Sequence, residues 1–163
     1  MKFPVRYLPF TLTKKDKKKQ IKMLMKSRKL YRTKKQYYTR KPLASYKNKT
    51  SNHILNARKI YKIQNLTPSK ELAQKTGCSL SALNQIVKKG QGAYFSSGSR
   101  PNQTSQSWGI ARLASSITAG KAAAVDYDII NAGCDHKKKA FILANKSRRQ
   151  YKHGQSKTRR VSV

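Results

Sequence analysis

The clearest structural pattern in the chain is Glu71-Leu72-Ala73-Gln74-Lys75-Thr76-Gly77-Cys78-Ser79-Leu80-Ser81-Ala82-Leu83-Asn84-Gln85-Ile86. It predicts two short helices joined by a tight turn. Thr67 can cap the first helix, with Pro68 in the first helical position, and Gly77 supplies its end. Ser79 can begin the second helix, which we expect to end at Gly90. This is the outline of a helix-turn-helix motif.

The helix-turn-helix outline is compatible with two roles. In DNA-binding proteins the second helix can enter a major groove, and the groove-facing positions here would be Ser79, Ser81, Ala82 and Gln85. These side chains are short and mostly uncharged, although the amide of Gln85 has the donor and acceptor needed to read adenine. A helical hairpin that serves only for packing explains the same residues. The motif therefore predicts the helical pair and leaves its role open.

A glycine-rich stretch follows the helical pair, over residues 88–102. It fits neither a Walker A pattern nor a dinucleotide-binding fingerprint, because no Gly-Lys-Ser/Thr closes the loop and no strand precedes it. We therefore expect a turn-rich connector whose Tyr94 and Phe95 enter the core.

Two more helices are predicted after this connector. Thr104 can cap a helix over residues 104–119 that carries Trp108 as a core anchor, and Asp126 can cap a last short helix that ends at Gly133. The predicted core combines the apolar residues of these elements: Leu72, Leu83, Ile86, Tyr94, Phe95, Trp108, Leu113 and Ile117.

Charge is distributed very unevenly around this central segment. The 163 residues include 38 Lys or Arg and five Asp or Glu, for a net charge of +33. Residues 1–62 carry +20, residues 63–135 carry +3 and residues 136–163 carry +10. Such a chain repels itself unless an anionic partner neutralises it. We therefore predict a mainly α protein, with a small near-neutral helical domain over 63–135 and long basic, partly extended arms over 1–62 and 136–163.

The N-terminal arm also contains helical patterns. Thr13 and Asp16 have the spacing of a capping box, and Ile21, Leu24, Met25 and Arg28 follow on one helix face. A basic amphipathic helix is predicted over about residues 14–31, and a second helix over about residues 52–63.

Tyrosines alternate with cations after the first of these helices. Tyrosine beside Lys or Arg can stack on bases or pack against a protein, while the cations meet phosphate or acidic side chains. The residues predicted to contact an anion, nucleic acid or protein partner are Lys14, Lys15, Lys17, Lys18, Lys19, Arg28, Arg32, Lys34, Lys35, Tyr37, Tyr38, Arg40, Lys41, Lys137, Lys138, Lys139, Arg148, Arg149, Arg159 and Arg160.

The sequence argues against an enzyme. Five acids and three histidines are scattered, whereas general acid–base chemistry needs such groups together in a pocket. Asp126 and Asp128 are natural internal partners for Arg100 or Arg112, and compensation of helix-end charge explains Asp126 equally well. We expect no catalytic residue, cofactor or small-molecule substrate.

Metal and disulfide frameworks also lack support from the sequence. Cys78 and Cys134 could form at most one disulfide, and a structural zinc site needs four ligands. We expect both cysteines to be small buried residues of a protein in a reducing compartment. The Cys134-Asp135-His136 tripeptide does not make a metal site, and no run of about 18 apolar residues predicts a membrane span.

The most specific part of the sequence is Ser97-Gly98-Ser99-Arg100-Pro101-Asn102-Gln103-Thr104, followed by Trp108-Gly109-Ile110-Ala111-Arg112. Together with the rest of residues 66–134, it resembles an uncharacterised small helical domain of large eukaryotic (nucleocytoplasmic) DNA viruses, with looser relatives in tailed phages. The resemblance carries no catalytic residue. It implies a virion structural protein in the inner capsid layer, present in the host cell during assembly.

Two classes of function follow. The first is a minor capsid protein that bridges the major capsid protein and other minor capsid proteins, with basic arms that reach capsid surfaces, the inner viral membrane or the genome. The alternative is a nucleic-acid-binding viral protein, either histone-like or with a helix-turn-helix. The resemblance favours the first, and the charge is compatible with both.

Overall fold

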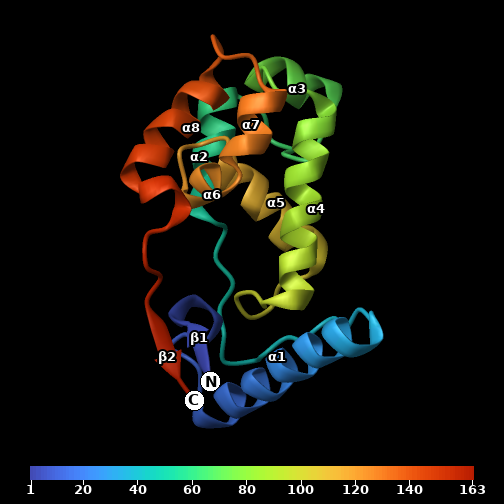
Figure 1. Cartoon of the computed structure of the whole chain (residues 1–163). Helices are drawn as coiled ribbons and strands as arrows, with labels where there is room; N and C mark the ends of the chain where they lie inside the picture. Colours follow the sequence, from blue (N-terminus) through green and yellow to red (C-terminus); the bar gives the residue numbers. More distant parts are fainter. The chain divides into compact units, whose positions relative to one another are not determined.

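The computed structural model describes all residues, 1–163, and is mainly helical (Figure 1). None of its helices combines the length and apolar character needed to cross a membrane. The elements in chain order are β1 (Lys2–Pro4), the 3-10 helix η1 (Val5–Tyr7), α1 (Lys14–Lys34), α2 (Asn52–Tyr61), α3 (Lys70–Thr76), α4 (Leu80–Ser96), α5 (Ser105–Ser116), α6 (Lys121–Val125), α7 (Tyr127–Gly133), α8 (Lys139–Gln150), the 3-10 helix η2 (Lys152–Gly154) and β2 (Arg160–Ser162).

The chain forms two compact units that interleave along the sequence. Unit 1 comprises Met1–Lys49, Gln91–Trp108 and Lys157–Val163, and unit 2 comprises Thr50–Gly90 and Gly109–Ser156. The long helix α4 carries the chain from unit 2 into unit 1, and α5 carries it back. These boundaries differ from the three segments predicted from charge, because cationic helices also carry buried faces that join a core.

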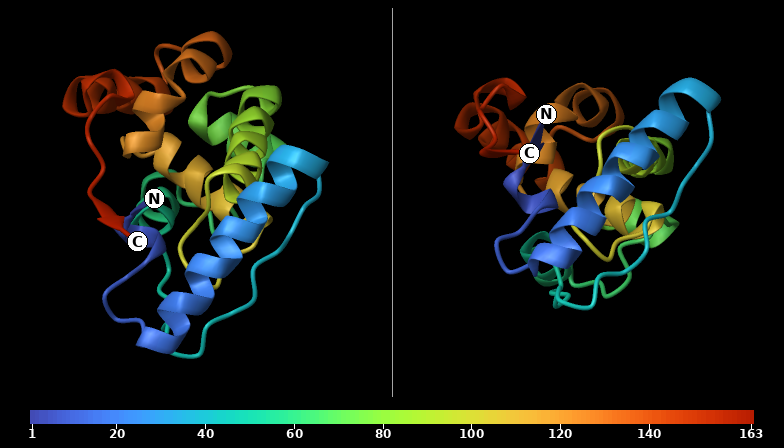
Figure 2. Two further views of the ribbon diagram at one scale, coloured as in Figure 1. Left: turned by 60° about the horizontal axis from the view of Figure 1, so that its bottom comes forward. Right: turned by 90° about the horizontal axis from the view of Figure 1, so that it is seen from below.

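Unit 1 is built around α1 and a small sheet. Strands β1 and β2 pair antiparallel, with Phe3 opposite Val161. The segment after α1, residues 35–49, turns back along the helix, as Figure 2 shows. Hydrogen bonds from Arg40 to Ser27 and from Ser45 to Asp16 fix this antiparallel return. The segment therefore lacks regular structure but is held in place along its length.

The predicted helix over 14–31 is present as α1, but its buried face differs from the predicted one. Thr13 caps it as expected, since its side chain accepts a hydrogen bond from the Asp16 backbone N–H. The buried face is formed by Gln20, Met23, Leu24 and Ser27, whereas Met25 is 45% exposed. Two polar residues in the buried face concealed it from a search for apolar periodicity. The second predicted helix is present as α2.

The predicted helix-turn-helix pair is present as α3 and the part of α4 up to Gly90, both in unit 2. The expected cap at Thr67 is wrong, because the Ser69 side chain caps α3 by accepting from the Leu72 N–H. Gly77 ends α3 in the left-handed conformation with φ +77°, and the Ser79 side chain accepts a hydrogen bond from the Ala82 N–H at the start of α4. The expected end of the second helix at Gly90 is wrong, because α4 continues to Ser96. A Cβ at Gly90 would lie 2.7 Å from the Cα of Gly109, so this glycine permits a close helix crossing with α5. Residues 88–96 are therefore helix rather than connector.

The two cysteines are buried as predicted, but they form a disulfide, which corrects the expectation of unlinked side chains. The turn of the helix pair and the end of α7 run antiparallel here. The Ser79 N–H donates to the Gly133 carbonyl at 2.7 Å, and the Asp135 N–H donates to the Gly77 carbonyl at 2.7 Å. Cys78 and Cys134 are opposed between these two bonds. Their separation of 56 residues gave no sign of this pairing in the sequence.

The C-terminal basic segment contains a helix that the sequence analysis, which was based on charge, did not predict. Helix α8 packs with α6 and α7, and its buried face consists of Ala140, Ala144 and Ser147. Such small side chains add little to hydropathy, so the segment was predicted to be a tail. The helix predicted over 104–119 is present as α5, and the last predicted helix is present as α7.

Most of the predicted core is buried. Two exceptions, Phe95 and Trp108, are only half-buried. Trp108 lies against the unit 1 cluster of Phe3, Tyr7 and Leu24, with its ring 6.2 Å from that of Tyr7. The buried predicted residues are Leu72, Leu83, Ile86, Tyr94, Leu113 and Ile117.

Candidate nucleic-acid interface

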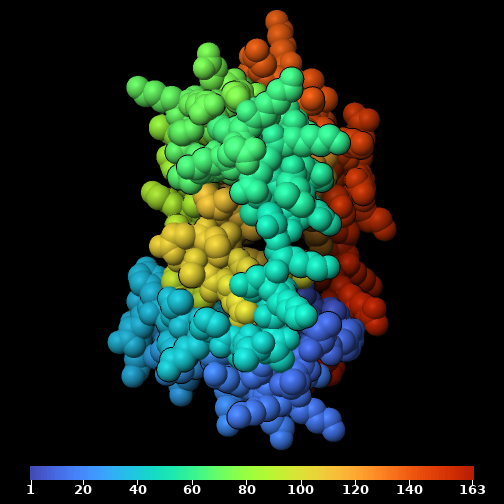
Figure 3. Space-filling model, turned by 180° about the vertical axis from the view of Figure 1, so that it is seen from behind, coloured from blue at the N-terminus to red at the C-terminus, as the bar shows by residue number.

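Helix α1 presents a continuous basic surface. Eleven of its 21 residues are Lys or Arg. An exposed row recurs at alternating spacings of four and three residues, which places its members on one side of the helix. At 1.5 Å per residue the row spans roughly 21 Å. We call it the lysine face, and it consists of Lys15, Lys19, Lys22, Lys26 and Lys29. Figure 3 shows part of the surface of the N-terminal segment in blue and light blue.

Unit 1 contains almost no internal counter-charge. It has 22 Lys and Arg side chains and one carboxylate, that of Asp16. Asp16 Oδ2 accepts hydrogen bonds from Ser45 Oγ at 2.6 Å and from the Ser45 backbone N–H at 3.0 Å. These bonds, supported by the charges of Lys19 and Lys15, hold the pKa of Asp16 below its ordinary value. The described ion pairs all lie in unit 2.

Arg40 is the exception among the predicted contact residues, because it is buried. Its guanidinium Nη1 donates to Ser27 Oγ and to the Tyr94 carbonyl, and its Nη2 donates to Ser99 Oγ, all at 2.9 Å. It lies 3.8 Å from the centre of the Tyr94 ring. Arg40 is 6% exposed, and burial lowers its pKa. The prediction of a surface contact is therefore corrected: Arg40 pins residues 35–49 to the rest of unit 1.

Arg28 is half-buried and lies near other cations. Its Nε donates to the Ser97 carbonyl at 2.7 Å, and its guanidinium lies 4.3 Å from the centre of the Phe3 ring. Burial lowers the pKa of Arg28, and the charges of Arg160 and Arg32 act in the same direction. Residues from both ends of the chain thus contribute to one basic surface.

The other predicted contact residues divide between the two units. Tyr37 is 74% exposed, Tyr38 is half-buried beneath Lys26, and Lys17 is half-buried. Arg148 is half-buried over the Tyr127 ring in unit 2. The exposed predicted residues of unit 1 are Lys14, Lys15, Lys18, Lys19, Arg32, Lys34, Lys35, Lys41, Arg159 and Arg160, and those of unit 2 are Lys137, Lys138, Lys139 and Arg149.

The start of α4 presents a second, less charged surface. Its exposed side consists of Leu80, Ser81, Asn84, Gln85 and Lys88, which we call the outer face of α4.

The outer face corrects the predicted groove-facing positions in part. Ser79, Ser81 and Gln85 are exposed, but Ala82 is 2% exposed because it packs against Gly133 of α7. Leu80, Asn84 and Lys88 were missed. Helical spacing from the predicted core residues Leu83 and Ile86 would have found Asn84 and Lys88.

The family comparison covers both of these surfaces. A model described as a family of unknown function, DUF5824, matches residues 4–139. The chain belongs to the DUF5824 family. The match includes α1 and α4, whereas the viral resemblance covers only residues 66–134. No curated protein matches the chain, and no solved structure does. A viral origin therefore stays a prediction.

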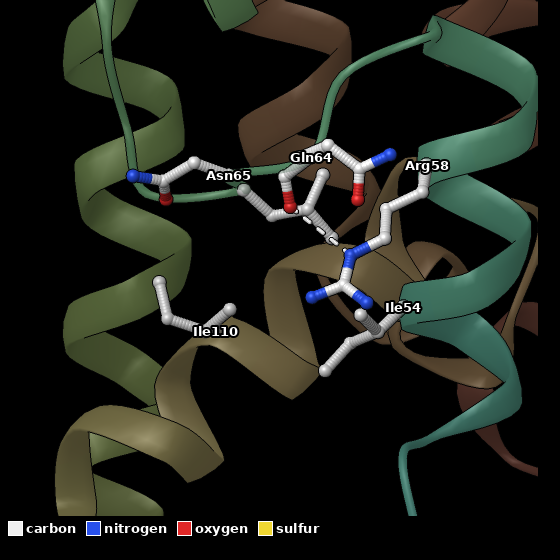
Figure 4. A pocket seen from close by; sticks show the side chains of 6 residues that line it. Ile54, Arg58, Gln64, Asn65 and Ile110 are labelled. Atoms are coloured by element: carbon white, nitrogen blue, oxygen red, sulfur yellow. Dashed lines mark hydrogen bonds between the residues drawn. The ribbon is translucent and has the colours of Figure 1, made fainter.

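Two shallow hollows occur in unit 2 of this DUF5824 protein. The first, of about 360 Å³, has an apolar floor that includes Ile54 and Ile110, with Arg58 at its edge (Figure 4). Arg58 Nε donates to the Gln64 carbonyl at 3.0 Å, so this cation is already engaged. The second hollow, of about 420 Å³, lies between Ser81 and Gln85 of α4 and Asp128 of α7.

Several acid–base and metal-ligand candidates of the DUF5824 chain make internal contacts instead. Arg112 Nε and Nη2 bind the two oxygens of the buried Asp126 carboxylate at 2.8 and 2.7 Å, and Lys89 lies 3.1 Å from the same carboxylate. The predicted Asp126–Arg112 pair is thus confirmed, while the Asp126 side chain does not cap α7. Cys134 is in the disulfide, and the His136 ring stacks on a phenylalanine. No three His, Cys, Asp or Glu side chains gather to hold a metal.

Proposed function

We propose that this protein binds nucleic acid, and that the lysine face of α1 is its main phosphate-contacting surface. The observation that supports the proposal is the uncompensated charge of unit 1, where 22 basic side chains share one acidic side chain, Asp16, whose Oδ2 already binds Ser45. A surface of this kind needs an external polyanion. The basic surface is fixed to a folded unit, since α1 is anchored by its buried face and by Arg40.

Nucleic acid matches the geometry of this surface. Duplex DNA offers one negative charge per about 1.7 Å of axis, so phosphates remain available along the roughly 21 Å of the lysine face. Tyr37, which is 74% exposed beside Lys34 and Lys35, adds a ring on which an unpaired base can stack.

Salt dependence provides the test. Five phosphate contacts predict a slope of about −4.5 for log affinity against log salt on duplex DNA from the lysine face alone. A variant with Gln at all five positions should show a slope flatter by about this amount in fluorescence anisotropy titrations. The matched control replaces five exposed lysines of unit 2 by Gln, which lowers the net charge equally and avoids the predicted contact residues: Lys59, Lys62, Lys75, Lys146 and Lys152.

The two variants separate the possible outcomes. A larger decrease of slope in the α1 variant supports the assignment to the lysine face. Equal decreases would show that binding follows total charge and would refute it. Failure of the unmodified protein to bind DNA or RNA at low salt would refute nucleic-acid binding altogether.

The minor capsid role stays a prediction that rests on the viral resemblance of residues 66–134. Its test is recovery of the protein from purified particles at fixed copy number, with retention after the genome has been released. Recovery only from infected-cell lysate would contradict it.

A further inference from the structure

Helices α3 and α4 form a helix pair with a tight turn. They are joined by the three residues Gly77, Cys78 and Ser79, and Gly77 has the positive φ that a tight turn needs. Leu72 of α3 and Leu83 of α4 are fully buried in one core cluster. The disulfide from Cys78 also ties the turn to the end of α7. The pair is thus held at its inner side, which leaves the outer side of α4 free.

The outer face of α4 has the dimensions and chemistry for a major groove. It extends over eight residue steps, or roughly 12 Å along the helix axis. A helix with side chains is about 10–12 Å in diameter, which fits a major groove about 12 Å wide. Asn84 and Gln85 supply the amides that pair with the N6 and N7 positions of adenine. Leu80, 39% exposed, offers an apolar contact for a thymine methyl group, and Lys88 can reach guanine or phosphate.

The polar side chains of the outer face remain available for an external partner. The hydrogen bond described among them joins Gln85 Nε2 to Ser81 Oγ at 3.2 Å, and both groups are exposed. A protein-binding surface would centre on aromatic or other large apolar residues, whereas this face has one partly exposed leucine among polar residues. The composition of the outer face therefore favours DNA over a protein partner.

The position of Asp128 favours contact of this face with base edges over contact with phosphates. Its carboxylate lies in the hollow beside Ser81 and Gln85. A carboxylate repels phosphate but accepts a hydrogen bond from the cytosine N4 amino group. This side of α4 is thus suited to base edges, and phosphate contacts are left to lysines such as Lys88 of α4 and Lys70 at the start of α3, both exposed.

We infer that the outer face of α4 enters the major groove of duplex DNA and reads base edges through Asn84 and Gln85. This inference rests on the proposed nucleic-acid binding and adds sequence preference to it. It assigns the two surfaces different tasks: the lysine face supplies affinity that is indifferent to sequence, and the outer face distinguishes one duplex from another.

The test is selection of bound duplexes from a randomised pool by the full chain, followed by competition between the enriched duplex and a scrambled one. N84A/Q85A should reduce the preference by roughly 5- to 150-fold for each bidentate amide–base pairing that the substitution removes, with unchanged affinity for the scrambled duplex. The matched control is N56A/Q150A, which removes the same side-chain types from exposed helical positions in unit 2 and should keep the preference. Circular dichroism checks that both variants fold.

Replacement of adenine by 7-deazaadenine in the enriched duplex gives an independent readout. This base lacks the N7 acceptor, so binding by the unmodified protein should weaken and binding by N84A/Q85A should not change. Binding without any enriched sequence would overturn the inference and leave the proposed function standing, as would a preference that N84A/Q85A retains. Absence of binding to every duplex would overturn both.

Discussion

The disulfide between Cys78 and Cys134 makes a quantitative prediction for stability. The bond crosslinks residues 56 positions apart, so its removal in C78A/C134A allows the unfolded chain many more conformations. The chain-entropy relation for a loop of this length gives about 4 kcal/mol at 25 °C. Alanine is the appropriate replacement because both side chains are buried, and a serine hydroxyl there would need a new hydrogen-bond partner.

Urea unfolding of unit 2 measures this decrease in stability. With a slope of about 2 kcal/mol per molar, the transition midpoint should fall by about 2 M. Trp108 belongs to unit 1, so its fluorescence does not report directly on the crosslinked unit. Hydrogen exchange of peptides from α3, α4 and α7, followed across the urea series, reports on the correct region.

Reduced unmodified protein is the control, because it lacks the crosslink but keeps both sulfur atoms. Its midpoint should match that of C78A/C134A. Equal midpoints for the oxidised and reduced protein would refute the entropic reasoning. Two free thiols in natively purified, air-oxidised protein would refute the disulfide itself.

Three further predictions concern single side chains. R112A leaves the buried carboxylate of Asp126 with one cation and should lower the free energy of unfolding by about 3 kcal/mol in thermal denaturation; no change would show that the pair is dispensable. Because hydrogen bonding lowers the pKa of Asp16, its ionised form stabilises unit 1 above the ordinary value of 3.8, and this stability is lost as the pH falls below it. D16N should abolish that part of the acid dependence of Trp108 fluorescence melting, and an unchanged pH profile would contradict this. G90A pushes a methyl group against the α5 backbone and should cost about 1–3 kcal/mol, whereas G92A, which meets no atom within 4 Å, should stabilise by about 0.5–1 kcal/mol in urea titrations; equal effects would refute the close-crossing argument.

Local signals in the sequence predicted much of the helical architecture. The Gly77 turn and the Thr13 cap depend on residues close in sequence, and both were found where capping rules place them. The prediction of where the second helix ends failed because Gly90 does not stop the helix but packs against Gly109, which lies nineteen residues away in sequence. A glycine that stops a helix and one that admits a neighbouring helix look the same in a single sequence.

The distribution of charge predicted which segments form the candidate interface, but it did not predict which of their residues are exposed. Counting cations identified the basic residues of α1 without showing which of them are exposed. The buried face includes the polar residues Gln20 and Ser27, so no continuous apolar stripe marks the opposite, exposed side of the helix. Arg40 was included with the exposed arginines because nothing near it in sequence identifies Ser27, Tyr94 and Ser99 as its acceptors. Long-range pairings of this kind arise from packing.

The pairing of β1 with β2 has a consequence for synthesis of the chain. A ribosome releases Lys2–Pro4 first, whereas the partner strand Arg160–Ser162 emerges only after Ser156, the last residue of unit 2. All of unit 2 is therefore synthesised before the last strand of unit 1, so the unit that holds the N-terminal residues cannot finish folding first, in contrast to the usual N-terminal-first order. Closing the two-stranded sheet is the step that completes unit 1, and until then the cations of α1 belong to an incomplete unit.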